Sequence, residues 1–313
     1  MENENQTPHK RRVHYKGKYP KKFEEKYKEL QPEKYKDTIA HVIQKGNTPA
    51  GMHISIMVKE ILDFLKIQPG ETGFDATLGY GGHTKAMLEQ LQGRGHIYAT
   101  DVDPEESAKT KKRLAEAGYG EEILTIRLQN FCTIDEIAKE VGGFDFILAD
   151  LGVSSMQIDN PSRGFSFKVD GPLDLRLNQQ QGISAAERLD TISREELAGM
   201  LYENSDEPYC EELAKAITDE IRKGHRIDTT TKLREVIEKT LDFLPEKEKK
   251  DTIKKTCQRT FQALRIDVNR EFEVLYEFME KLPGALKPGG RVAILTFHSG
   301  EDKLVKQALK EGY

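Results

Sequence analysis

Apolar and polar positions follow two alternating patterns along most of the chain. From Met52 onward, short apolar runs are separated by segments in which apolar residues recur at helical spacing. This pattern predicts strands at residues 74–78, 96–100, 123–127, 144–150 and 291–297. It predicts helices at residues 58–65, from about residue 83, at 107–117 and at 261–282, with a turn at 286–291 before the last strand. The predicted fold class is α/β, with a parallel sheet and crossover helices.

The segment between the fourth and fifth predicted strands is longer than a crossover needs. Residues 161–177 are rich in turn residues, and residues 185–248 show helical periodicity. Helix breaks are predicted near Pro208, Gly224 and Pro245, and a capping box from Ser193 to Glu196. We expect an inserted helical substrate-binding subdomain at residues 158–255, within a core formed by residues 51–157 and 256–313. Ligands of open α/β sheets bind beyond the carboxyl ends of the strands, so this insertion is well placed to hold a substrate.

A glycine turn, Gly79-Tyr-Gly-Gly-His-Thr84, follows the first predicted strand and precedes a helix. Gly79, Gly81 and Gly82 lack a Cβ atom, so the backbone can turn tightly and approach a ligand, while the helix presents free N–H groups. The spacing is not the G-x-G-x-x-G of dinucleotide binders, and glycine turns also form for structural reasons. The turn is therefore a candidate cofactor site of unspecified type.

Asp101 ends the second predicted strand about 20 residues after the glycines, the separation at which an acidic residue meets ribose hydroxyls in doubly wound folds. The alternative role for Asp101 is to cap the next helix. Asp103, directly before Pro104, is better suited to that role. Asp101 is therefore predicted to bind ribose.

The fourth predicted strand ends at Asp150, beside the first strand and its glycine turn. In methyl transfer to an exocyclic amine, the nitrogen lone pair is delocalised into the base, so an acceptor for the amine hydrogens favours attack. Asp150 is the catalytic candidate, and most of the rate gain is expected from positioning. The alternative is that Asp150 caps the following turn.

Candidates for substrate binding lie in the loop at residues 160–176 and at the end of the last strand. The loop combines arginines, aromatics and turn residues, a composition suited to gripping phosphate and stacking a flipped base. The candidates are Arg163, Phe165, Phe167, Arg176 and His298. Phenylalanines in such a loop also serve as core anchors, and a single histidine is more often structural, so neither His83 nor His298 is assigned as a base.

Composition narrows the class of protein. The chain has 313 residues, 37% of them hydrophobic, and a net charge of -5, so it can bury a core and is not uniformly basic. Three widely spaced cysteines suggest neither a disulfide framework nor a zinc site. No apolar run is long enough to span a bilayer and no signal peptide is evident, so a cytoplasmic protein without membrane contact is expected.

Residues 1–50 differ from the rest in being rich in lysine and tyrosine. Cations there can engage phosphates and rings can stack on bases, which favours an RNA-binding arm. An equally weighted interpretation is a solvated extension whose aromatic residues pack on the main domain.

Taken in order, these motifs make the chain resemble the bacterial 16S rRNA cytosine N4-methyltransferases, RsmH or MraW. The resemblance runs from residue 53 to about 306 and rests on the glycine turn and on the segments beginning at Asp101, Asp150, Arg163, Asp170, Ser184, Phe261 and Phe297. It implies a class I, Rossmann-like fold with a helical insertion, S-adenosylmethionine as donor and a ribosomal RNA cytosine as acceptor. Motif matching carries donor contacts over to Gly81, Gly82, His83, Asp101, Phe131, Asp150 and Gln157.

Several positions depart from the family pattern and suggest a divergent paralogue. Leu78 and Tyr80 replace family residues in the glycine turn, so an arginine expected beside the cofactor is absent. Thr256-Cys-Gln replaces a His-Pro segment, and Gly300 and Lys303 alter the last motif. The chain also stops at Tyr313, before the strand pair and basic tail expected of the family. This predicts either a five-stranded sheet or another segment that covers its edge.

The leading prediction is an S-adenosylmethionine-dependent methyltransferase acting on a cytosine N4 amine, most plausibly in 16S rRNA. One alternative is the same chemistry on another rRNA or tRNA site. A second is an RNA-binding ribosome-assembly factor without turnover. A nicotinamide-dependent oxidoreductase is disfavoured because its glycine spacing is missing. RNA is the expected partner, no metal is expected, and a homodimer is left open.

Overall fold

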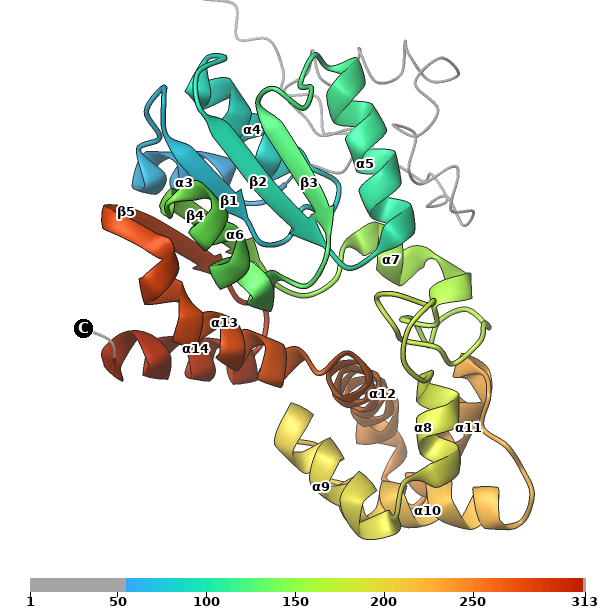
Figure 1. The fold of residues 1–313 in the computed structure, drawn as a ribbon. Helices are drawn as coiled ribbons and strands as arrows, with labels where there is room; N and C mark the ends of the chain where they lie inside the picture. Colours follow the sequence, from blue (N-terminus) through green and yellow to red (C-terminus); the bar gives the residue numbers. More distant parts are fainter. Residues whose placement is uncertain (1–54, 312–313) are drawn as a thin grey trace, which may run out of the picture. The chain divides into compact units, whose positions relative to one another are not determined.

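Five parallel strands form a sheet in the order β3-β2-β1-β4-β5 (Figure 1). The computed structural model describes residues 55–311, and the strands among them are β1 (Thr72–Asp75), β2 (His96–Asp101), β3 (Leu124–Leu128), β4 (Phe144–Asp150) and β5 (Leu286–Leu295). The predicted α/β class is confirmed. The segment at residues 1–50, for which an RNA-binding arm was one prediction, lies outside the described residues.

Helices cover both faces of the sheet. One hydrophobic cluster joins strand residues to α3 (Val58–Leu65), α4 (Gly82–Leu91) and α5 (Pro104–Glu116). A second cluster joins them to α6 (Ile134–Val141), α13 (Glu271–Ala285) and α14 (Ser299–Glu311). Phe146 and Ile147 of β4 enter opposite clusters because successive side chains of a strand alternate between its faces. Burial on both faces explains why these strands are continuous apolar runs.

The predicted start of the fifth strand and the predicted end of the first strand need correction. Residues 286–291 were predicted as a turn, but β5 already begins at Leu286. Phe144 pairs with Leu286 and Phe146 with Arg291, so the extra residues of β5 form an irregular bulge within the strand. β1 ends at Asp75 rather than at residue 78, although the N–H of Ala76 still donates to the carbonyl of Leu148 at 2.8 Å.

The single helix predicted at residues 261–282 is two helices. α12 (Glu246–Asn269) ends and α13 begins at Arg270, whose φ of 51° is left-handed and breaks the helix. The side chain of Arg265 spans this break and donates to both carboxylate oxygens of Glu271, at 2.8 and 3.0 Å. Periodicity alone missed the break because apolar positions recur on both sides of it. Helices α6 and α14 were not predicted either.

A helical region lies between β4 and β5 in the sequence (Figure 1). It comprises α8 (Ala185–Thr191), α9 (Arg194–Ser205), α10 (Cys210–Arg222), α11 (Thr230–Thr240) and α12. One hydrophobic cluster unites these helices with Phe165 and reaches along α12 to Leu264. The packing of this region therefore continues past the boundary expected at residue 255.

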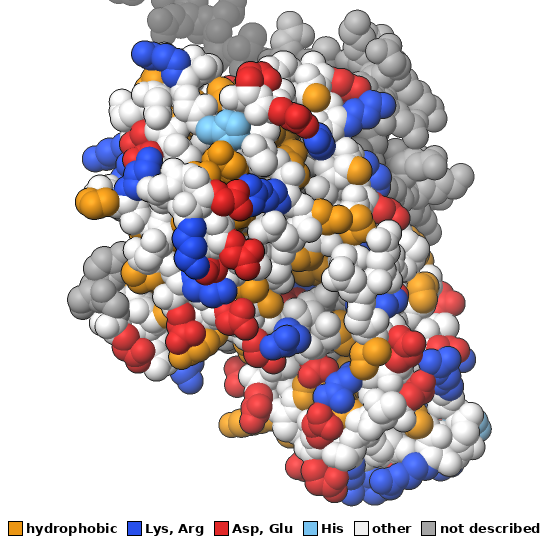
Figure 2. Space-filling view, in the orientation of Figure 1, with side chains coloured by type: hydrophobic (Ala, Val, Ile, Leu, Met, Phe, Trp, Pro, Cys, Tyr) orange, Lys and Arg blue, Asp and Glu red, His pale blue; other side chains and the backbone are white. Residues whose placement is uncertain are grey.

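The predicted capping box at Ser193 is only half formed. The Ser193 side chain accepts from the N–H of Glu196, but the Glu196 carboxylate binds Arg188 instead of returning to the helix end. A complete box stands at Ser184 and Glu187, before α8. On the face shown in Figure 2, acidic and basic side chains are interspersed. Among residues 55–311, no helix is long and apolar enough to cross a membrane.

Candidate active site

The glycine turn between β1 and α4 requires its glycines. Gly79 and Gly81 have φ angles of 48° and 83°, in the left-handed region that favours glycine. A Cβ atom on Gly81 would lie 2.7 Å from the methyl carbon of Thr110, and one on Gly82 would lie 2.2 Å from the hydroxyl of Ser55. Gly79 faces open space, since a Cβ there would meet only the carbonyl oxygen of Thr77, at 3.8 Å. The turn is thus closely covered at Gly81 and Gly82 and open at Gly79.

Helix α5 and strand β2 hold the backbone of this turn. The N–H of Gly79 donates to Asp101 Oδ2 at 2.8 Å, and its carbonyl accepts from the hydroxyl of Thr110 at 2.6 Å. Arg113 Nη2 donates to the carbonyl of Tyr80 at 2.9 Å, and the guanidinium carbon lies 3.7 Å from the centre of the Tyr80 ring. The sequence predicted no arginine at this turn because Tyr80 occupies the expected position. The structure supplies one from α5.

Asp101 and Asp103 have different roles, since Asp103 caps a helix and Asp101 binds the glycine turn. Asp103 caps α5 by accepting from the N–H groups of Glu105 and Glu106, as predicted. Asp101 accepts one backbone N–H on each oxygen, from Gly79 at 2.8 Å and from Asp103 at 2.9 Å. A carboxylate oxygen has a second lone pair, so these bonds leave capacity for a ligand hydroxyl. Burial raises the pKa of Asp101 to about 6.

Asp75, at the end of β1, is a site residue that the sequence analysis missed. Its side chain is only 1% exposed and accepts from the hydroxyl of Thr84 at 2.6 Å and from the N–H of Thr77 at 3.0 Å. Burial raises the pKa of Asp75, and these hydrogen bonds partly oppose that effect. The signal that could have revealed it is an acidic residue between an apolar strand and a glycine turn.

His83 joins α4 to Asp150. Its Nε2 lies 2.8 Å from the carbonyl oxygen of Ile56, and its Nδ1 lies 3.3 Å from Asp150 Oδ2. Both neighbours are acceptors, so the imidazolium, which donates from both nitrogens, suits this position best. Burial lowers the pKa of His83, but the hydrogen bonds to Asp150 and Ile56 outweigh it and leave the pKa raised.

The Asp150 carboxylate has unused hydrogen-bonding capacity. Its N–H donates to the hydroxyl of Thr77 at 2.7 Å, and its Oδ2 faces His83. Its Oδ1 is buried and has no hydrogen-bond partner among the described residues. An unsatisfied buried acceptor is costly, which points to a donor supplied by a ligand. The structure thus places Asp150, His83 and the glycine turn at one edge of the sheet.

Gln157 and Arg163 meet at Asp103 and do not face an open site. Arg163 is 4% exposed, and its Nη1 donates to Asp103 Oδ2 at 2.7 Å while its Nη2 donates to the carbonyl of Leu177 at 2.6 Å. Gln157 Nε2 donates to the same Asp103 oxygen at 3.1 Å. These contacts favour positioning roles over the direct ligand contacts predicted for both residues.

The predicted aromatic contacts fall into two groups. Phe165 is 8% exposed within the hydrophobic cluster of the helical region, and Phe167 packs edge-on against Phe261 with ring centres 5.7 Å apart. Both therefore follow the alternative weighed for them, core anchoring. Phe131 is half-buried and packs edge-on against Phe278 beyond β3, which leaves its ring partly accessible.

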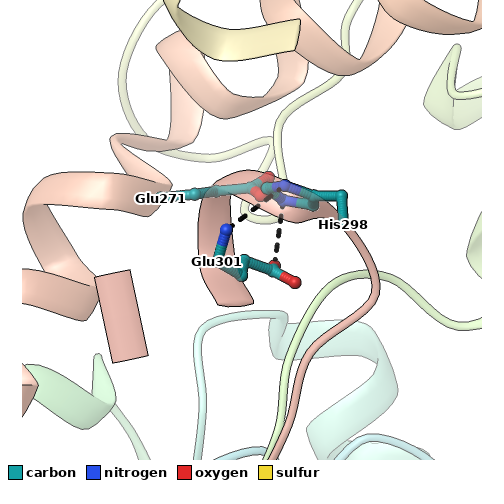
Figure 3. Close-up of side chains that lie close together, drawn as sticks. All are labelled: Glu271, His298 and Glu301. Atoms are coloured by element: carbon teal, nitrogen blue, oxygen red, sulfur yellow. Dashed lines mark hydrogen bonds and ion pairs between the residues drawn. The ribbon is translucent and has the colours of Figure 1, made fainter. Parts of the chain in front are cut away.

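Arg176 and His298 are also engaged within the chain. Arg176 forms two parallel hydrogen bonds with Asp174, each 2.8 Å long. His298 Nε2 lies 3.2 Å from Glu301 Oε1 (Figure 3), so its ring turns toward α14. Neither contact brings these side chains toward Asp150, and their predicted substrate binding stays a prediction.

Glu271, His298 and Glu301 are the only described group with ligand atoms close enough, within 4.8 Å, to hold a metal ion (Figure 3). Arg265 already donates twice to Glu271. The guanidinium therefore supplies the positive charge that these carboxylates need, and the cluster is explained without a metal.

Comparison with known proteins decides the family. The sequence profile of the MraW methylase family matches residues 50–313. The chain belongs to this family. A ribosomal RNA small subunit methyltransferase H 1 of Agathobacter rectalis is 88% identical over 97% of this chain and 87% of its own length. A ribosomal RNA small subunit methyltransferase H 1 of Lachnoclostridium phytofermentans is 70% identical over 98% of this chain and 84% of its own length. A ribosomal RNA small subunit methyltransferase H 2 of Alkaliphilus metalliredigens is 65% identical over 96% of this chain and 86% of its own length.

S-adenosylmethionine is the methyl donor of this MraW-family methylase, and the site fits it. The donor carries a ribose diol, an adenine ring and a charged amino-acid end. Asp101 offers carboxylate oxygens to the diol, and the glycine turn leaves open space at Gly79. Phe131 offers a half-buried ring. We assign these residues to the donor as proposals.

Proposed function

We propose that this protein transfers a methyl group from S-adenosylmethionine to the exocyclic N4 amine of a cytosine in 16S rRNA. The observation that carries the proposal is the Asp150 carboxylate, which stands at the end of β4 with one oxygen unpartnered. An exocyclic amine offers the hydrogen that this oxygen lacks. Relatives of 65–88% identity are named for methylation of small-subunit ribosomal RNA, which supports the choice of RNA.

The side chains divide the work of the transfer. S-adenosylmethionine supplies the electrophilic methyl group. Asp150 accepts a hydrogen bond from the amine, which increases the electron density on nitrogen, and its carboxylate would take up the proton that the nitrogen loses when the N–CH3 bond forms. His83 contacts Asp150 Oδ2 and so fixes the carboxylate with Oδ1 left for the amine. As an imidazolium with both nitrogens engaged, His83 is a positioning residue and not the base.

Nucleoside analysis of RNA tests this function. Ribosomal RNA from a strain lacking the gene should contain less N4-methylcytidine, as measured by mass spectrometry, and the purified protein with S-adenosylmethionine should restore it. Unchanged N4-methylcytidine in the deletion strain, with no transfer in vitro, would refute the proposal.

A second candidate is the same chemistry at another rRNA or tRNA position. Relatives at 55–88% identity carry numbered names, H 1 or H 2, whereas those at 41% and 36% carry none. Together with Tyr80 in the glycine turn, this numbering favours a subgroup with its own target. Mapping the methylated position by primer extension separates the two candidates. Tight RNA binding without any transfer would instead support the ribosome-assembly factor.

A further inference from the structure

Phe297 lies at the same edge of the sheet as Asp150. Asp150 pairs with Leu295 where β4 and β5 run in parallel, and the N–H of Leu151 donates to the carbonyl of Leu295 at 3.1 Å. Phe297 follows two residues beyond Leu295, past the end of β5. The aromatic ring and the catalytic candidate therefore extend from the carboxyl ends of two neighbouring strands, where ligands of open α/β sheets bind.

The ring of Phe297 is exposed although its backbone is fixed. The residue is 56% exposed, while its N–H donates to Glu301 Oε2 at 2.8 Å. Glu301 is 3% exposed and is held in turn by His298 (Figure 3). The centre of the His298 ring lies 5.8 Å from that of Phe272. A buried network thus fixes the start of α14 and leaves an apolar ring in solvent. Single exposed apolar residues are common on protein surfaces, so what distinguishes Phe297 is its place beyond the end of β5, the neighbour of β4.

The loop after β4 keeps the space around this ring clear. Gly152 is exposed with a φ of 89°, and a Cβ atom there would lie 3.8 Å from Cδ2 of Phe297. The glycine backbone therefore runs beside the ring without a side chain that would cover it. The ring face stays open next to the residue that carries the unpartnered carboxylate oxygen.

We propose that Phe297 stacks on the target nucleobase while Asp150 accepts from its exocyclic amine. This inference rests on the proposed function and adds a specific substrate contact. An unpaired base offers a flat π-face for the ring and an amine hydrogen for the carboxylate, so one occupant satisfies both features. Phe297 replaces His298 as the substrate contact from this motif, because His298 faces Glu301.

The test uses the full chain and the RNA isolated from the deletion strain. Phe297→Leu removes the aromatic face, and Phe297→Trp keeps it. Phe64→Leu is the matched control, since Phe64 is 57% exposed but lies on α3. Stacking on a base is strong enough that Phe297→Leu should raise the KM for RNA about 10- to 100-fold. S-adenosylmethionine affinity by calorimetry and Tm should stay at wild-type values, and Phe297→Trp should restore the KM.

The outcomes separate this inference from the proposed function. Wild-type transfer with an unchanged RNA KM in Phe297→Leu overturns the stacking role and leaves the function standing. A parallel loss of S-adenosylmethionine affinity also overturns it, because the ring would then support the donor site. Absence of transfer by the wild-type protein to any RNA overturns both.

Discussion

The region that we assign to the methyl donor and the region that we assign to the acceptor base are built differently. On the donor side, β2 and α5 bind the backbone of the glycine turn through Asp101, Thr110 and Arg113. On the acceptor side, Asp150 has a buried oxygen without a partner among the described residues, and Phe297 is 56% exposed. The hydrogen bonds of the first region are formed within the chain. In the second region, the described residues supply neither a hydrogen-bond donor to Asp150 Oδ1 nor a side chain that covers the Phe297 ring.

This difference follows from what each region must bind. S-adenosylmethionine is a small ligand that is the same in every reaction. A preorganised turn binds it without the entropy cost of ordering the turn each time. A base within RNA must leave its stack, and it brings hydrogen-bond donors and a π-face with it. The side chains that bind such a base therefore lack this hydrogen-bond donor and this stacking partner in the free protein.

Removal of the acceptor carboxylate should have the largest effect. Asp150→Ala deletes the oxygen that receives the amine hydrogen, so kcat should fall about 100-fold or more, in the range of a positioned acid or base. Single-turnover methylation at saturating S-adenosylmethionine measures this step. Phe64→Leu, on α3, should keep the wild-type rate. Wild-type turnover in Asp150→Ala would show that the unpartnered oxygen is not part of the chemistry.

Arg163 joins the start of α5 to the loop after β4, because it binds Asp103 and the carbonyl of Leu177. Arg163→Ala leaves the carboxylate of Asp103, a residue that is 1% exposed, without its charged partner. Loss of one member of a buried pair costs about 3–5 kcal/mol, so the free energy of unfolding should fall by that amount. Arg234→Ala, in an exposed pair with Glu238, should cost about 0.2–1 kcal/mol. Equal urea midpoints for the two variants would contradict this reasoning.

The sequence predicted those parts of the molecule that depend on local pattern. Strands β2, β3 and β4, helix α3, the Asp103 cap and the breaks near Pro208 and Gly224 all follow from periodicity and turn residues. The break at Arg270 did not, because a left-handed arginine leaves no compositional signal. The first part of β5, residues 286–291, was predicted as a turn because its proline and glycines are typical of loops, whereas the part from Arg291 onward was predicted as a strand.

The sequence predicted which residues lie at the candidate site better than it predicted which partners their side chains contact. Asp101 and Asp150 end β2 and β4, the two parallel strands that flank β1, so topology alone brings them to one edge. Which side chains face a ligand depends on long-range pairing that no local pattern encodes. Arg163 was assigned to the substrate, yet it meets Asp103, 60 residues away. His298 was preferred over Phe297, although only a folded α14 shows that Glu301 binds the histidine.

Protonation of Asp101 should weaken the donor side. The burial that raises its pKa to about 6 disfavours the carboxylate that ribose hydroxyls would bind. Affinity for S-adenosylmethionine should therefore increase as the pH rises through about 6, since only the charged form accepts from both the turn and the diol. Calorimetry between about pH 5 and 7.5 measures this. Asp101→Asn should bind about 10-fold more weakly and without the pH dependence.

The stability of the free protein should change with pH in the opposite direction. A carboxyl whose pKa is raised on folding contributes stability below its unfolded value of 3.8, and that contribution is lost as the pH rises through about 6. Unliganded wild-type protein should therefore lose stability over this interval relative to Asp101→Asn. Parallel pH profiles of stability for the two proteins would remove Asp101 as the titrating group.

The smallest effect is expected from loosening the glycine turn at Arg113. Arg113→Ala removes the cation over Tyr80 and the donor to the Tyr80 carbonyl, while Thr110 still holds Gly79. One cation–π contact and one hydrogen bond suggest about a 5- to 10-fold loss of S-adenosylmethionine affinity. The KM for RNA and kcat at saturating donor should not change, because Asp150 and Phe297 lie on other elements. Tyr80→Phe keeps the ring and the backbone carbonyl, so the cation–π contact and the hydrogen bond from Arg113 should remain. An RNA KM that moves together with donor affinity would show that the two regions are coupled, and that the rigid turn also shapes the acceptor edge.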